Sequence, residues 1–167
     1  MSTNDEARPC ATLLRAHWPR LLAAVPAREV KRYAEELTEG WQVTDVALPQ
    51  SGLGLLQLRD SALADSYFLG EIPLARAHVR ISRPDGETSE GAVQLLDDRA
   101  SLARAIAILD AVKAAQWPGS ERIDALLRAG LACREAVAAS RRALLARTRV
   151  DFALLGTAAE EDDDVAA

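Results

Sequence analysis

The sequence contains, at residues 67–81, the stretch Tyr67-Phe68-Leu69-Gly70-Glu71-Ile72-Pro73-Leu74-Ala75-Arg76-Ala77-His78-Val79-Arg80-Ile81. An aromatic pair leads into a glycine and an acid, and an alternating segment follows from Leu74. Side chains alternate between the two faces of a strand. We therefore predict a strand with one small apolar face that packs on helices. Its other face carries two arginines and a histidine.

Three further segments have the composition of strands. They are residues 41–48, which end at Pro49, residues 53–59, and residues 90–96. Residues 50–52 indicate a turn, residues 60–66 a loop, and Arg83-Pro84-Asp85-Gly86 a second turn by its Pro-Asp-Gly chemistry. Because short turns join antiparallel strands, the four strands predict one antiparallel sheet.

Apolar residues at helical spacing flank this sheet on both sides in the sequence. The N-terminal part predicts a helix through Leu13 and Leu22, interrupted at Pro19, and a second helix at residues 27–37. The C-terminal part predicts a helix capped by Asp97 or Asp98 and running to about residue 116, and another at residues 121–147, capped by Ser120. We expect Trp18 and Tyr33 to be core anchors. The predicted fold is α+β: a four-stranded antiparallel sheet with N-terminal helices and two long C-terminal helices.

The 167 residues suit one domain. We predict a disordered N-terminus at residues 1–9, a single domain at residues 10–156 and an acidic disordered tail at residues 157–167. The net charge of −5 argues against nucleic-acid binding, and the tail residues 160–164 supply five negative charges. No apolar run approaches the length of a membrane span, which predicts a cytoplasmic protein that does not bind membranes.

The sequence contains no recognisable catalytic or metal-binding motif, and catalytic residues cannot be assigned from it. Cys10 and Cys133 are far apart and match no metal spacing, so we expect two reduced thiols. His17 is expected to be a surface or packing residue. His78 lies between two arginines that would oppose its protonation, and the sequence suggests no partner for it as a general base.

Arg76 and Arg80 form the most suggestive pair. Residues four apart on a strand are about 13 Å apart on the same face. That separation is too long for both to bind one phosphate, but it suits a polyphosphate or two carboxylates of a partner. The alternative is pairing across the sheet with acids such as Glu90.

Several motifs, taken in order, resemble the PhnG subunit of the carbon–phosphorus lyase system for phosphonate use. The family runs from a Ser/Thr-Gly-Leu strand to an arginine, an aromatic-Phe-x-Gly-acid segment, an Arg-bearing alternating strand and an Asp-Gly turn. A strand leading into a helix follows. The corresponding residues here are Ser51-Gly52-Leu53, Arg59, Tyr67-Phe68-Leu69-Gly70-Glu71, Ala75 to Ile81, Asp85-Gly86, residues 91–96 and Leu109-Asp110-Ala111. Trp18 and Arg149-Val150-Asp151-Phe152 also match.

This resemblance implies an accessory subunit of a larger enzyme. Subunits of this type act with PhnH-, PhnI- and PhnL-type partners to join a phosphonate to the ribose C1 of MgATP with release of adenine, as α-D-ribose 1-methylphosphonate 5-triphosphate synthase. They share a symmetric core complex with the PhnJ-type radical enzyme, in which we expect two copies of this chain. MgATP is then a substrate of the complex, and this chain binds no cofactor. We expect its ligand or subunit contacts among Arg59, Gly70, Glu71, Arg76, His78, Arg80 and Arg99.

The sequence departs from the family pattern at three places. Residues 61–64, Ser-Ala-Leu-Ala, replace a glycine-rich loop, residues 97–100, Asp-Asp-Arg-Ala, replace Gly-Arg-Asp-Lys, and Leu102 replaces a histidine. These departures favour an alternative, a divergent scaffold subunit without a catalytic contribution. A third hypothesis is a stand-alone binder of a phosphorylated metabolite through Arg59, Arg76 and Arg80.

Overall fold

The computed structural model describes residues 13–148 and has an α+β fold. It contains the α-helices α1 to α4, a short 3₁₀ helix and one antiparallel sheet in the order β1-β2-β3. The predicted class is therefore correct, but the prediction of four strands is wrong. The predicted N-terminal and C-terminal disordered segments, like Cys10 and residues 149–152, lie outside the described residues.

The difference lies in β1, a single strand that runs from Gln42 to Arg59. The segments predicted as two strands and a turn are continuous, and the pairing register with β2 shifts between Asp45 and Ala47 and between Ala47 and Gln50. Pro49 lies within the second shift. A proline cannot donate a ladder hydrogen bond, but an edge strand tolerates it at an irregularity. The proline therefore interrupts the pairing without ending the strand.

The alternation predicted for residues 74–81 is confirmed in β2, which spans Ser66–Ser82. Ala75, Ala77, Val79 and Ile81 are buried, and the residues between them are exposed or half-buried. β3, Thr88–Leu95, pairs with the end of β2 from Ser82↔Thr88 to Ala75↔Leu95. The predicted turn between these strands is confirmed as well, with the Gly86 amide donating to the Arg83 carbonyl oxygen at 3.0 Å.

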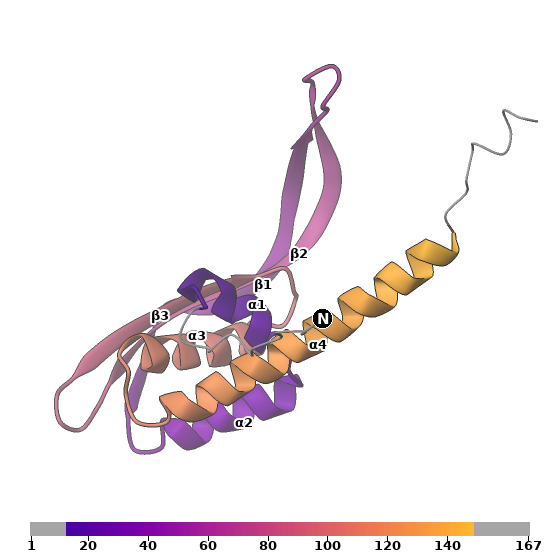
Figure 1. Cartoon of the computed structure of the whole chain (residues 1–167). Coiled ribbons are helices and arrows are strands. Elements are labelled where there is room, and N and C mark those ends of the chain that lie inside the picture. Colours follow the sequence, from indigo (N-terminus) through magenta and orange to yellow (C-terminus); the bar gives the residue numbers. More distant parts are fainter. Residues whose placement is uncertain (1–12, 149–167) are drawn as a thin grey trace, which may run out of the picture. The chain divides into compact units, whose positions relative to one another are not determined.

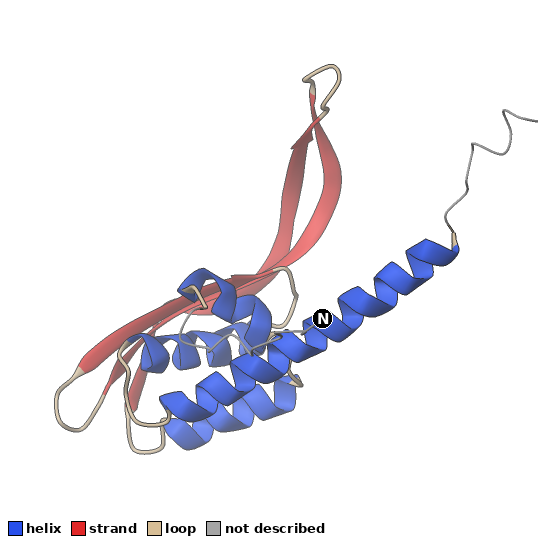
Figure 2. Ribbon diagram, viewed as in Figure 1, coloured by secondary structure: helices blue, strands red, loops and turns tan. Residues whose placement is uncertain are grey.

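α3, Ala100–Ala114, is the central helix of the core. It packs on β2 and β3 with one side and contacts α1 and α2 with others, so eleven of its residues are buried. Two of them are charged and paired: Asp110 with Arg15 at 2.6 Å and Lys113 with Asp124 at 2.6 Å. A helix that is apolar on nearly all sides requires such complete covering. α3 lies on one face of the sheet, and α2 lies beyond α3 on that side (Figure 2).

The helix and the sheet approach most closely at Gly91 in β3. A Cβ atom added to Gly91 would lie 2.0 Å from the carbonyl oxygen of Ala107 and 2.7 Å from the amide nitrogen of Ala111. Both atoms belong to the backbone of α3 and cannot move aside cheaply. Nearby, the Ser89 hydroxyl donates to the Ala111 carbonyl oxygen at 2.8 Å. Only glycine permits this distance between the layers.

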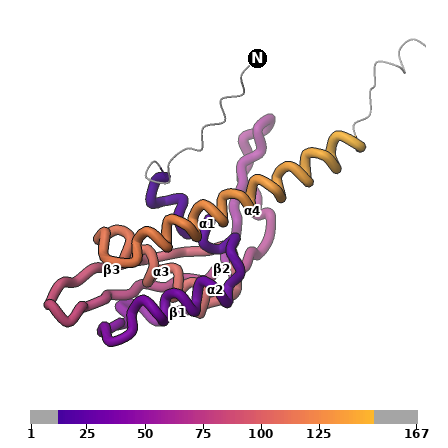
Figure 3. The backbone as a smooth tube through the Cα atoms, turned by 60° about the horizontal axis from the view of Figure 1, so that its bottom comes forward, coloured from indigo at the N-terminus to yellow at the C-terminus, as the bar shows by residue number. Residues whose placement is uncertain are grey.

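The N-terminal segment differs in part from the predicted helix. It forms a 3₁₀ helix at Arg15–His17 and then α1, Trp18–Leu22, which has Pro19 in its first turn. α2 spans Ala27–Leu37 as predicted and runs beside α3 (Figure 3). The core positions of Trp18 and Tyr33 are confirmed, because their side chains are 9% and 4% exposed.

α4 spans Ser120–Arg147 and belongs to two compact units of the chain. The first unit ends at Arg134 and the second begins at Glu135. Within the first unit, a Cβ atom at Gly130 would lie 2.0 Å from the Leu21 carbonyl oxygen, so α4 and α1 are in backbone contact there. No helix among residues 13–148 is both long and apolar enough to cross a membrane.

Replacement of Gly91 by alanine tests the contact between the helix and the sheet. We expect Gly91→Ala to lower the free energy of unfolding by about 1–3 kcal/mol or more, because the added methyl group overlaps the α3 backbone. Urea unfolding curves measure the change. The control is Gly52→Ala in β1, where an added Cβ meets nothing within 4 Å. Equal unfolding midpoints for the two variants would contradict the packing described here.

Candidate functional site

The face of the sheet opposite the helices carries the predicted polar side chains in three transverse rows. The pairing register places Gln50, Arg76 and Gln94 in one row, Ala47, His78 and Ala92 in the next, and Thr44, Arg80 and Glu90 in the third. In each row the middle residue comes from β2, and its neighbours come from β1 and β3. The strand alternation that buries the alanines of β2 thus presents its cationic residues on the open face.

Glu90 contacts two of the three β2 side chains. Its Oε1 atom accepts a hydrogen bond from Arg80 Nε at 2.7 Å, and its Oε2 atom lies 2.9 Å from His78 Nε2. The hydrogen bonds from Arg80 and His78 lower the pKa of Glu90. Arg80 therefore pairs with Glu90 across the sheet, which is the alternative that the sequence left open. His78 also acquires a partner that its own segment of sequence did not reveal.

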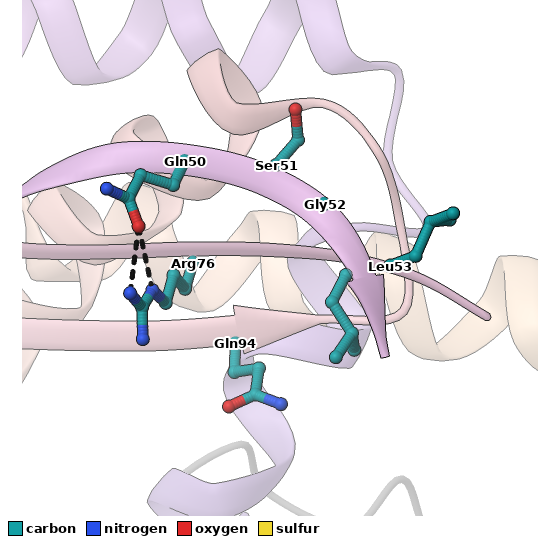
Figure 4. A pocket seen from close by; sticks show the side chains of 7 residues that line it. Gln50, Ser51, Gly52, Leu53, Arg76 and Gln94 are labelled. Atoms are coloured by element: carbon teal, nitrogen blue, oxygen red, sulfur yellow. Dashed lines mark hydrogen bonds between the residues drawn. The ribbon is translucent and has the colours of Figure 1, made fainter. Parts of the chain in front are cut away.

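Arg76 has a different environment. Its Nε and Nη2 atoms donate to the Gln50 side-chain oxygen at 3.2 and 2.8 Å (Figure 4). A hollow of about 310 Å³ lies beside it, lined by Gln50, Ser51, Gly52, Leu53, Leu74, Arg76 and Gln94. A second hollow of about 450 Å³ also includes Arg76 and Gln94 and has the small Ala47 and Ala92 on its lining. The two hollows are open, so this face resembles a contact surface more than an enclosed active site.

Beyond the end of β3, β1 and β2 continue as a two-stranded ribbon that extends away from α1, α2 and α3 (Figure 1). We call residues 53–72 the arm. None of these residues is buried. The arm nevertheless carries seven large hydrophobic residues that are 37–76% exposed, from both strands and the loop between them: Leu53, Leu55, Leu58, Leu63, Tyr67, Phe68 and Leu69. A lone two-stranded hairpin is marginally stable in water, and apolar surface of this kind marks interaction sites.

The predicted contact residues separate into three groups. Arg76, His78 and Arg80 lie together on the open sheet face. Arg59, Gly70 and Glu71 belong to the arm, where Arg59 pairs with Ser66 and Glu71 with Leu55 across the ribbon. Arg99 alone forms the third group, at the start of α3. The described residues contain no group of three or more His, Cys, Asp or Glu side chains that could hold a metal ion.

A scan against family models matches residues 14–156 to the phosphonate metabolism protein PhnG. The chain belongs to the PhnG family. The matched range contains the whole sheet, the arm and all four α-helices. A search of curated proteins gave no match. This PhnG-family chain is therefore a phosphonate metabolism protein.

The loop at the tip of the arm contains residues 61–64, which the resemblance to the family marked as a departure. The Asp60 carboxylate accepts hydrogen bonds from the amides of Ala62 and Leu63 at 2.7 and 2.8 Å, which lower the pKa of Asp60. Ala64 has a φ of 59°, a conformation that glycine adopts at lower cost. The loop thus keeps a backbone conformation that favours glycine while carrying an alanine.

The segment 97–100 forms a local ion pair in place of the predicted helix cap. α3 begins at Ala100 with Arg99 as its N-cap residue, so neither Asp97 nor Asp98 has the predicted capping role. The Asp97 carboxylate instead accepts hydrogen bonds from the Arg99 Nε atom and the Arg99 amide, both at 2.8 Å. The pKa of Asp97 is lowered to about 2, mainly by the hydrogen bonds from the Arg99 side chain.

This ion pair predicts a measurable titration. In the Arg99→Gln variant we expect the pKa of Asp97 to rise from about 2 toward its ordinary value of about 3.9, as followed by carboxyl ¹³C NMR. Because the folded-state pKa is the lower one, the stability from this pair is present above about pH 4 and is lost as the pH falls toward 2. Arg104→Gln, which leaves the pair intact, is the control. An unchanged Asp97 midpoint in Arg99→Gln would refute this cause of the shift.

Proposed function

We propose that this chain is an accessory subunit of the carbon–phosphorus lyase complex. Together with PhnI-, PhnH- and PhnL-type subunits, it takes part in transferring an alkylphosphonate to the ribose C1 of MgATP with release of adenine. The complex also includes a PhnJ-type subunit and two copies of this chain. It is located in the cytoplasm. Membership of the PhnG family supports this proposal, and the exposed arm is the structural observation that carries it.

The polar face of the sheet fits an accessory role better than an independent active site. Its strongest candidate for general acid–base chemistry, His78, is paired with Glu90, and Glu90 is shared with Arg80. Both hollows beside this face are open, whereas enzymes exclude water from the reacting groups. A catalytic contribution of this face would therefore require a second subunit to cover it. MgATP is bound by the assembled complex in this proposal, and the chain itself holds no cofactor.

The arm supplies the surface through which such a subunit can be held. Covering an exposed leucine or phenylalanine contributes about 1.5–3 kcal/mol when the burial is complete. The arm presents seven large apolar or aromatic side chains on a ribbon that has no core of its own. Its acid Glu71 and its base Arg59 lie on the same ribbon and can set the orientation of the partner. We infer that a PhnI-type subunit covers the arm.

A second candidate function is a scaffold of the same system that has lost any catalytic contribution. Two observations favour it. Ala64 holds a left-handed backbone conformation in the loop that is glycine-rich in the family, and Asp97 occupies the Arg99 side chain that would otherwise be free for a ligand. Both features reduce the freedom of this chain to approach a ligand closely.

Substitutions in the arm test the accessory role. We expect Leu55→Ser combined with Phe68→Ser to leave the free energy of unfolding within about 0.5 kcal/mol of wild type, because both side chains are exposed. The same variant should lose at least about tenfold in co-purification with the PhnI-type subunit from cells grown on methylphosphonate. Leu14→Ser, an exposed leucine outside the arm, is the matched control. Undiminished co-purification of the arm variant would contradict the proposed interface.

Removal of this chain, followed by growth and by adenine release, separates the two candidates. A cell that lacks this chain should fail to grow with methylphosphonate as its phosphorus source, and the wild-type gene should restore growth. A scaffold without a catalytic contribution predicts that the assembled partners retain phosphonate-dependent adenine release from MgATP when the chain is removed. Recovery of the chain only as a lone monomer would exclude both candidates.

A further inference from the structure

Gln50 fixes the orientation of the Arg76 side chain. The Gln50 Oε1 atom accepts hydrogen bonds from both Nε and Nη2 of Arg76, at 3.2 and 2.8 Å. These bonds occupy one edge of the guanidinium group. A guanidinium has five N–H donors in a planar fork, so the edge formed by Nη1 and Nη2 keeps donors for a second acceptor. Figure 4 shows Gln50 and Arg76 pointing toward one another.

No carboxylate among residues 13–148 occupies that second edge. Arg80 is paired with Glu90, Arg83 with Asp85 and Glu87, and Arg104 with Asp45. Arg76 forms no ion pair with a described residue, although its row neighbour Gln50 holds it in place. A charged fork that is both oriented and not neutralised is suited to an oxyanion, which it can bind through two parallel hydrogen bonds.

The surroundings of Arg76 supply space and a further donor. Gln94 lies opposite Arg76 in the pairing of β2 with β3, lines both adjacent hollows, and makes no side-chain hydrogen bond within the described residues. Its carboxamide can donate two hydrogen bonds. Ala47 and Ala92, in the next row, leave the second hollow open above the backbone. Together these residues form a shallow site rich in donors and without an acid.

We propose that the row Gln50–Arg76–Gln94 is an oxyanion-binding site in which Arg76 forms the bidentate contact and Gln50 is a positioning residue. The ligand is a carboxylate or phosphoryl group. It comes from one of two sources, a small anion in solution or an acidic side chain of a subunit that covers the face. Only the second source rests on the proposed function. Because the site is exposed, its affinity for a small anion is on the order of millimolar.

NMR of the Arg side chains in the full chain tests the small-anion source. The probes are sodium acetate and inorganic phosphate, titrated against sodium chloride at equal ionic strength. We expect a saturable shift of the Arg76 Nε–H signal, which is assigned by its disappearance in Arg76→Lys. In Gln50→Ala the dissociation constant should rise by about threefold or more, because the fork is no longer oriented. The Arg28 signal, from an exposed arginine of α2 that forms no ion pair with any residue from 13 to 148, should shift no more than it does in chloride.

Co-purification tests the covering-subunit source. Arg76→Lys keeps the charge but removes the fork, and Arg28→Lys is the matched control. If the ligand is an acid of the covering subunit, Arg76→Lys should reduce recovery of the assembly by about fivefold while Arg28→Lys leaves it unchanged.

The two experiments decide the proposal together. A saturable Arg76 shift supports the site with a small anion, even if the wild-type chain assembles with no partner and the proposed function fails. Selective loss of assembly in Arg76→Lys without a saturable shift supports the site with a partner acid. The absence of both effects overturns the oxyanion site.

Discussion

The close contact between the sheet and α3 is the constraint on which this structure depends. Gly91 allows the backbone of β3 to reach the backbone of α3, and the small side chains of Ala75 and Ala77 allow β2 to follow. α1 and α2 contact other sides of α3, which packs on one face of the sheet. The alternation of β2 then places its arginines and its histidine on the opposite, open face. The polar surface is thus a direct consequence of the apolar packing.

The same constraint explains the arm. α3 and β3 cover β2 only from Ala75 onward, whereas β1 and β2 remain paired as far as Arg59 and Ser66. The ribbon beyond that point has two exposed faces and no helix to pack on. Its hydrogen bonds between strands hold the two chains together, but they do not remove its leucines and aromatic rings from water. Such an exposed apolar surface is most simply explained if this phosphonate metabolism protein works as part of an assembly.

Sequence patterns predicted the elements whose signals are local. The alternation of β2, the bounds of α2 and the turn at Gly86 all follow from neighbouring residues. The single long strand β1 was missed because Pro49 normally ends a strand, and only its position on the sheet edge makes it tolerable. The hydrogen bond from Arg76 to Gln50 could not be predicted, because the sequence pattern places Gln50 in a turn. The two contacts of Glu90 depend on the register between β2 and β3, which no local pattern specifies.

Hydrogen exchange measured by mass spectrometry, on the chain alone and on the assembly co-purified from cells grown on phosphonate, tests the central claim most directly. In the isolated chain, amides of β2 from Ala75 to Ile81 and of α3 should be protected by about the full free energy of unfolding, while those of the arm exchange rapidly. In the assembly, the arm should gain at least about tenfold in protection. An arm as well protected as α3 in the isolated chain, or one with the same exchange rates in both samples, would contradict this account.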